Sequence, residues 1–79
     1  MNPIYLKKDY PYNCYAKFTT EGMIDVFSTD VNTKLFDDQE DCDCNFRNYI
    51  KDGFVRCEQQ EFDEALIKAV SVINKLSNL

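Results

Sequence analysis

The alternation of apolar and polar positions in the first third of the chain predicts a β-hairpin. In residues 12–19, YNCYAKFT, every second side chain falls on the same face, which is the period of a half-buried strand. The residues TEG follow and predict a turn, in which Gly22 is able to adopt a positive φ. Residues 23–29, MIDVFST, then alternate as a second strand. Because an isolated hairpin is marginal in water, we expect the short segments 4–6 and 33–36 to add outer strands.

The clearest periodicity lies near the C-terminus and predicts a helix over residues 60–77. Apolar side chains recur there at the i, i+3, i+4, i+7 spacing of an amphipathic helix. Acids occupy the first turn and Lys75 the last, which suits the helix dipole. Ile67 and Val72 broaden the apolar stripe, so we expect more than one neighbour to cover this helix. The stripe itself comprises Phe62, Ala65, Leu66, Ala69, Val70, Ile73 and Leu76.

A second, shorter helix is predicted near residues 43–52. Phe46, Tyr49 and Ile50 repeat at helical spacing, and Gly53 suits the position that ends a helix. The acids that precede Phe46 would then lie in or before the first turn, where negative charge is favourable. Cys42 would fall on the apolar side of this helix, four residues before Phe46.

These elements predict an α+β fold in a single domain, residues 1–79. We expect a small antiparallel β-sheet, made of the hairpin and short outer strands, packed against the long C-terminal helix. The segment 54–59 is either a further short strand or the connection into that helix. A domain of this size has a small core, so a disulfide, a metal or a partner subunit would be a common addition.

Charge and hydropathy argue against several classes of function. The net charge is −5, and it is uneven: residues 1–20 carry +2 and the remainder carries −7. Such a field repels nucleic acid and attracts basic surfaces, which argues against direct nucleic-acid binding. The longest apolar run is three residues and no secretory h-region is present, so we expect neither a membrane span nor export. The predicted location is the cytoplasm, where cysteines are reduced.

The four cysteines raise alternatives that the sequence leaves open. Zinc would take four thiolates, but the C-x-C spacing differs from the usual C-x-x-C knuckle. Disulfides are a second alternative, and a redox-active pair is a weaker one because acidic neighbours raise thiol pKa values. A calcium loop beginning at Asp41 matches several ligand positions but has Phe46 where glycine is required. The candidate zinc ligands are Cys14, Cys42, Cys44 and Cys57.

Catalysis receives little support from the residue types. The chain contains no histidine, so no Ser–His or Cys–His pair can form, and it has no glycine-rich phosphate loop. We therefore expect a non-enzymatic protein that uses no cofactor. Exposed tyrosines are enriched at protein interfaces, and clustered acids attract a basic partner. The predicted partner-binding residues are Asp37, Asp38, Glu40, Asp41, Asp43, Tyr10, Tyr12 and Tyr15.

In length, acidity, sheet-plus-helix pattern and lack of catalytic groups, the chain resembles the small acidic proteins of phages and mobile elements, among them anti-CRISPR inhibitors. The resemblance spans the whole chain and includes no specific motif. It implies a binder that blocks a larger host complex, such as a CRISPR-type machine that processes nucleic acid. The partner would be another protein or a ribonucleoprotein. A zinc-stabilised structural module and a self-associating homodimer, joined through the stripe around Ile67 and Val72, are the rival interpretations.

Overall fold

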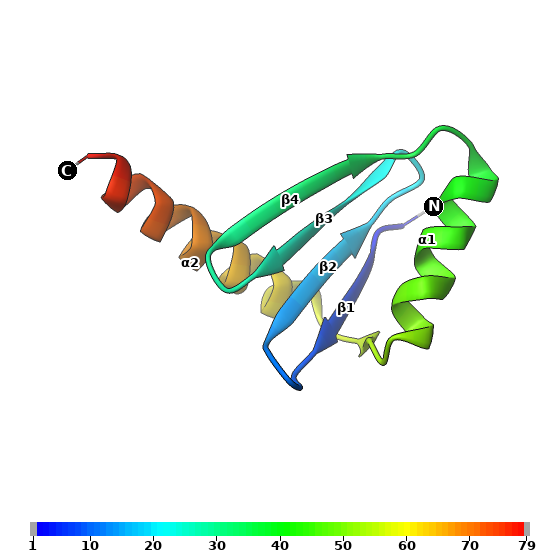
Figure 1. Ribbon diagram of the computed structural model, residues 1–79, viewed down its shortest axis with the longest axis horizontal. Helices are drawn as coiled ribbons and strands as arrows, with labels where there is room; N and C mark the ends of the chain where they lie inside the picture. The colour runs from blue at the N-terminus through cyan, green and yellow to red at the C-terminus, as the bar shows by residue number, and fades with distance from the viewer. Residues whose placement is uncertain (1, 79) are drawn as a thin grey trace.

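The computed structural model describes residues 2–78 and confirms the predicted α+β fold. Five antiparallel strands form one sheet in the order β4-β3-β2-β1-β5, with one helix in mid-sequence and a longer one at the C-terminus. Figure 1 shows α1 on one side of the sheet and α2 crossing the other. The elements are β1 (Ile4–Lys8), β2 (Cys14–Phe18), β3 (Gly22–Phe27), β4 (Asp30–Leu35), α1 (Gln39–Lys51), β5 (Val55–Arg56) and α2 (Gln59–Ser77).

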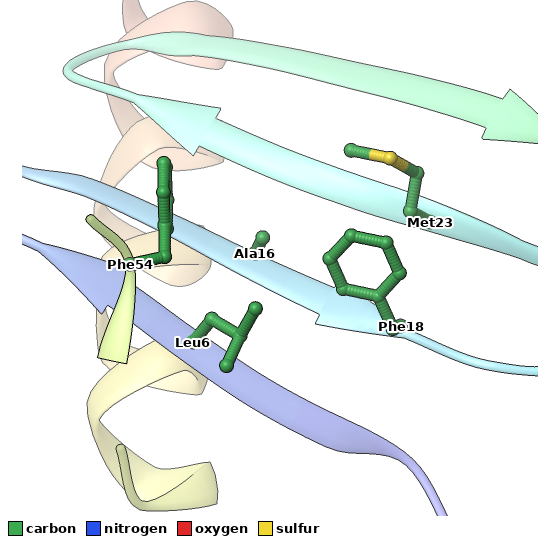
Figure 2. Close-up of a cluster of buried hydrophobic side chains, with 5 residues drawn as sticks. All are labelled: Leu6, Ala16, Phe18, Met23 and Phe54. Carbon is green, nitrogen blue, oxygen red and sulfur yellow. The ribbon is translucent and has the colours of Figure 1, made fainter. Parts of the chain in front are cut away.

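The first of two buried clusters lies between the sheet and α1. Leu6 pairs with Ala16 across β1 and β2, and Phe18 pairs with Met23 across β2 and β3, so all four share one face. Figure 2 shows these side chains together with Phe54, which follows α1. Each of the five is at most 8% exposed. This cluster explains why the short helix is needed, because without α1 one apolar face of the sheet would be open to water.

Phe18 occupies the centre of an aromatic group in this first cluster. Its ring centroid lies 5.5 Å from that of Phe46 and 5.1 Å from that of Tyr49, both on α1 and both in edge-to-face geometry. Phe36, just before α1, stacks on Phe18 at 6.2 Å. Such pairs contribute about 0.5–1.5 kcal/mol each beyond the area they bury. Phe46 and Tyr49 of the predicted helical repeat are therefore confirmed on the side of α1 that meets the sheet, whereas Ile50, the third residue of that repeat, is 44% exposed.

The second cluster lies between the opposite face of the sheet and α2. Val26 of β3 is buried there with Phe62 and Ala69 of α2, and Tyr5 of β1 packs against Phe62 with ring centroids 5.6 Å apart. Val31 of β4 belongs to the periphery of the same cluster. The long C-terminal helix was predicted at 60–77, and the structure confirms it with α2 at Gln59–Ser77.

The β2–β3 hairpin has the predicted strands, but the role assigned to Gly22 is wrong. Gly22 is the first residue of β3, and Gly53 has the only positive φ among the glycines. Glycine is required at position 22 for a different reason: a Cβ there would collide with the backbone carbonyl oxygen of Lys34 on β4. The turn is instead held by Thr19, whose Oγ1 accepts hydrogen bonds from the N–H groups of Glu21 and Gly22, each 3.2 Å long.

Helix α1 begins four residues earlier than its predicted start. Asp38 is the N-cap, and its side chain accepts a hydrogen bond of 2.8 Å from the N–H of Asp41. Asp41 in turn accepts a bond of 3.2 Å from the N–H of Asp37. The side-chain bonds of the acids thus satisfy N–H groups at the helix start, which is why the helix extends into the acidic segment. Its end agrees with the prediction, since Gly53 follows the helix with φ +106°.

Replacing Gly22 by alanine is predicted to destabilise the fold by about 1–3 kcal/mol, because the added Cβ forces β3 and β4 apart. The change is measured by urea unfolding. Thr20→Ala, at an exposed position in the same turn, is the matched control and should leave the unfolding midpoint nearly unchanged. Equal stability of Gly22→Ala and the parent protein would contradict the close approach of these two strands.

Candidate functional site

The structure separates the predicted partner-binding residues into two groups. The acids 37–43 lie at the start of α1. This end of the sheet is the one with the β2–β3 turn, because the N–H of Phe36 donates a hydrogen bond of 2.8 Å to the carbonyl of Glu21 in that turn. Tyr10 and Tyr12 lie in the connection between β1 and β2, at the opposite end of the same strands. Figure 1 shows these two ends of the sheet well apart. One continuous acidic and aromatic surface is therefore not formed by the predicted set.

Two of the α1 acids have structural roles. Besides accepting from Asp37, Asp41 accepts a bond of 2.9 Å from the side-chain amide of Asn45 and lies 3.8 Å from Lys34 Nζ. Asp38 caps the helix, as described above. The stretch 37–43 is thus the solvated start of a helix, and its charges contribute chiefly to stability and to the field of the molecule.

The tyrosines line a groove, here called the α2 groove, between the strand ends and the first half of α2. Tyr12 packs edge-on against Phe27 with ring centroids 5.4 Å apart, and it remains 66% exposed. Tyr10, beside the groove in the same connection, is 83% exposed. The groove has a volume of about 1110 Å³. Its lining includes the aromatic residues Tyr12, Tyr15 and Phe27, the acids Asp9, Glu61 and Glu64, and Lys68.

The carboxylates of the α2 groove come from positions that the sequence analysis did not select. Glu61 Oε2 accepts a bond of 2.9 Å from the N–H of Glu58, and its other oxygen pairs with Lys7 Nζ at 2.9 Å. The Glu58 N–H and then the ammonium of Lys7 lower the pKa of Glu61, while the same pair raises the pKa of Lys7. Glu64 accepts a bond of 3.1 Å from the side chain of Gln60. The lowered pKa keeps the carboxylate of Glu61 ionised at neutral pH.

The four cysteines do not converge. Cys14 begins β2, Cys42 and Cys44 lie on different sides of α1, and Cys57 follows β5. Within residues 2–78, no three metal-ligating side chains come together, and all four cysteines are free thiols. Burial raises the pKa of Cys14, Cys42 and Cys57, which disfavours the thiolate form that zinc requires.

The calcium-loop hypothesis is wrong. Its proposed ligands Asp41, Asp43 and Asn45 lie within the regular helix α1, whereas an EF-hand site requires a loop that folds around the ion. The prediction that Cys42 lies on the apolar side of this helix is confirmed, since it is only 4% exposed. Its Sγ lies 3.7 Å from the carbonyl oxygen of Thr19, on the inner side of α1.

Comparisons with known proteins add no relatives. No protein-family model matches the chain, and neither the curated proteins nor the solved structures yield a significant match. In the part of the chain that the structure describes, no helix is long and apolar enough to span a membrane.

Native-state thiol reactivity should follow burial. With a thiol reagent such as Ellman's reagent, Cys44 is predicted to react first because it is exposed. Cys42 is predicted to react only on unfolding, and Cys14 and Cys57 at intermediate rates, because burial raises their pKa values. Cys44→Ser should abolish the fast phase alone. Four equally protected thiols that a chelator releases together would instead support a zinc site.

Proposed function

We propose that the protein is a non-enzymatic binding module that holds a basic segment of a partner protein in the α2 groove. The observation that carries this proposal is the combination of an aromatic wall with the carboxylates of Asp9 and Glu64, beside the Lys7-paired Glu61, in one concave surface. Arginine and lysine side chains suit such a surface, because they interact favourably with aromatic ring faces and with carboxylates. The exposed rings of Tyr10 and Tyr12 supply the anchors that interfaces commonly use.

The charge distribution supports a basic partner. The whole chain carries −5, so its field draws basic surfaces towards it before contact. The acids at the start of α1 lie away from the α2 groove and add to this long-range attraction. Electrostatic steering of this kind raises association rates and weakens with salt. In this proposal the groove supplies the contacts and the α1 acids supply part of the steering.

A non-enzymatic role is supported by the chemistry of the described residues. The sequence has no histidine, and three of the four thiols have raised pKa values. Histidine, the commonest general base near neutrality, is therefore absent, and these three thiols are poor nucleophiles. As the setting for this binding we propose the inhibitor role that the resemblance to small phage proteins implies, against a host complex with a basic nucleic-acid groove.

A titration of the isotope-labelled protein with a short arginine- and lysine-rich peptide, followed by amide chemical shifts, tests the proposal. The amides of Tyr12, Tyr15 and Phe27 are predicted to shift, and the affinity is predicted to fall as salt rises. A glutamate-containing peptide of equal length should produce no shifts. The double substitution Asp9→Asn with Glu64→Gln should weaken binding on the order of fivefold by removing two groove charges.

The matched control is Asp37→Asn with Asp43→Asn, which changes the net charge equally at the start of α1. This variant is predicted to slow association slightly and to leave the bound-state shifts in place. If it weakens binding as much as the groove variant does, the contact surface is the α1 acids and the groove assignment is wrong. Absence of any shift with the basic peptide at low salt would contradict the proposed partner chemistry altogether.

A further inference from the structure

Helix α2 extends past its own sheet while keeping the same apolar side. Phe62 and Ala69 face the sheet and are 1% and 0% exposed, whereas Ile73 and Leu76 are 41% and 64% exposed. At 100° per residue these four side chains lie within one narrow sector of the helix. Figure 1 shows why the exposure rises: α2 crosses the sheet towards β4, and its last turns project beyond β4 and the β3–β4 turn.

The strand at this edge is also incompletely covered. β4 is the end strand of the sheet, so its outer edge has no strand partner among residues 2–78. Leu35 pairs with Gly22, and Thr33 pairs with Ile24, which places Leu35 on the α2 face of β4. Leu35 is nevertheless 82% exposed, because α2 passes beneath Val31 at the other end of the strand. An apolar strand residue is thus uncovered at one end of β4, and an apolar helix side is uncovered beyond the other end.

We propose that these two surfaces cover each other in a homodimer. The β4 strands of two copies pair antiparallel about a two-fold axis at Thr33, which joins the two sheets edge to edge. This register places Val31 opposite Leu35 of the second copy on the α2 face. Since α2 of the second copy passes beneath its own Val31, its last turns then lie beneath Leu35 of the first copy. The projecting end of each α2 would then pack against the sheet of the other copy, and each exposed Leu35 would pack against the other copy's α2.

The spacing of the two helices supports this arrangement. In the proposed register the helices pass beneath β4 positions four residues apart, which is about 13 Å along a strand. Packed helices lie roughly 8–10 Å apart. The two-fold axis makes the two helices antiparallel, and because α2 crosses the strands obliquely (Figure 1), their perpendicular separation is shorter than this distance along the strand. Val70, which is 41% exposed and adjoins the sheet-facing sector, would lie between them.

The area available suits a second copy. In this register Lys34 of each copy lies opposite Asn32 of the other on the α1 side of the joined sheet, with Asp30 and Lys34 as its diagonal neighbours. Val70, Ile73, Leu76 and Leu35 would each bury on the order of 100 Å². With the paired strand edges, two copies approach the roughly 1,000 Å² that a specific interface needs. The residues differ from those that line the α2 groove, so this inference does not depend on the proposed function.

Sedimentation equilibrium from low to several hundred micromolar tests the helix part of the dimer. The parent protein is predicted to approach twice the chain mass at high concentration, and Ile73→Asn with Leu76→Asn is predicted to raise the dissociation constant at least tenfold. Ile67→Asn is the matched control: Ile67 is 68% exposed but lies on the opposite side of α2 from Ala69. It should dimerise like the parent. Circular dichroism checks that all three proteins retain the same helical content.

Cross-linking tests the strand part. In a Cys44→Ser background, Thr33→Cys is predicted to form an intermolecular disulfide under mild oxidation, because antiparallel partners on a two-fold axis have Cα atoms close enough to bridge. Glu21→Cys, exposed in the β2–β3 turn, is the control and should form no intermolecular disulfide. A monomeric parent at every concentration would overturn the proposal. A dimer that is insensitive to the α2 substitutions, or that gives no Thr33→Cys cross-link, would also overturn it.

Discussion

Alternation along β1, β2 and β3 gives the sheet two apolar faces, and each face requires its own helix. Phe18 is buried on one face beneath α1, and Phe62 of α2 is buried on the other against Tyr5. In a chain of 79 residues the sheet cannot fold back on itself to hide either face, so both helices are needed to remove it from water. The two helices that cover these faces differ in length, and the features described below follow from that difference.

The course of α2 determines where the two proposed binding surfaces lie. Its first turns lie beneath β1, where Glu61 pairs with Lys7, and this places Glu61 and Glu64 opposite the tyrosines of the β1–β2 connection. Its last turns pass β4, where they leave Ile73 and Leu76 without cover. The groove and the exposed helix end are therefore two consequences of one geometric fact, a 19-residue helix laid across a narrow sheet.

Local pattern predicted the elements better than it predicted the site. The stripe of α2 and the alternation of the β2–β3 hairpin are properties of neighbouring residues, and both are confirmed. The start of α1 was placed too late because side-chain capping by Asp38, which extends the helix, leaves no trace in hydrophobic periodicity. Gly22 was misread for a similar reason: its requirement comes from the approach of Lys34, twelve residues away in the chain.

The composition of the site required the tertiary structure. The tyrosines were selected from sequence, but the acids that face them, Glu61 and Glu64, lie about fifty residues later and had been explained fully by the helix dipole. The acids that were selected stand at the other end of the strands. The acids and the tyrosines come together only in the folded chain, where contacts such as the Lys7–Glu61 ion pair hold the start of α2 against β1.

Native-state amide exchange of Phe62→Leu tests most directly whether the sheet depends on both helices. If burial of Phe62 against the sheet holds the whole domain together, the slowest-exchanging amides of β1, β2 and β3 should all lose protection by the same factor, together with those of α1. Faster exchange confined to α2, with the sheet and α1 unchanged, would show that α2 is an appendage and would contradict this account.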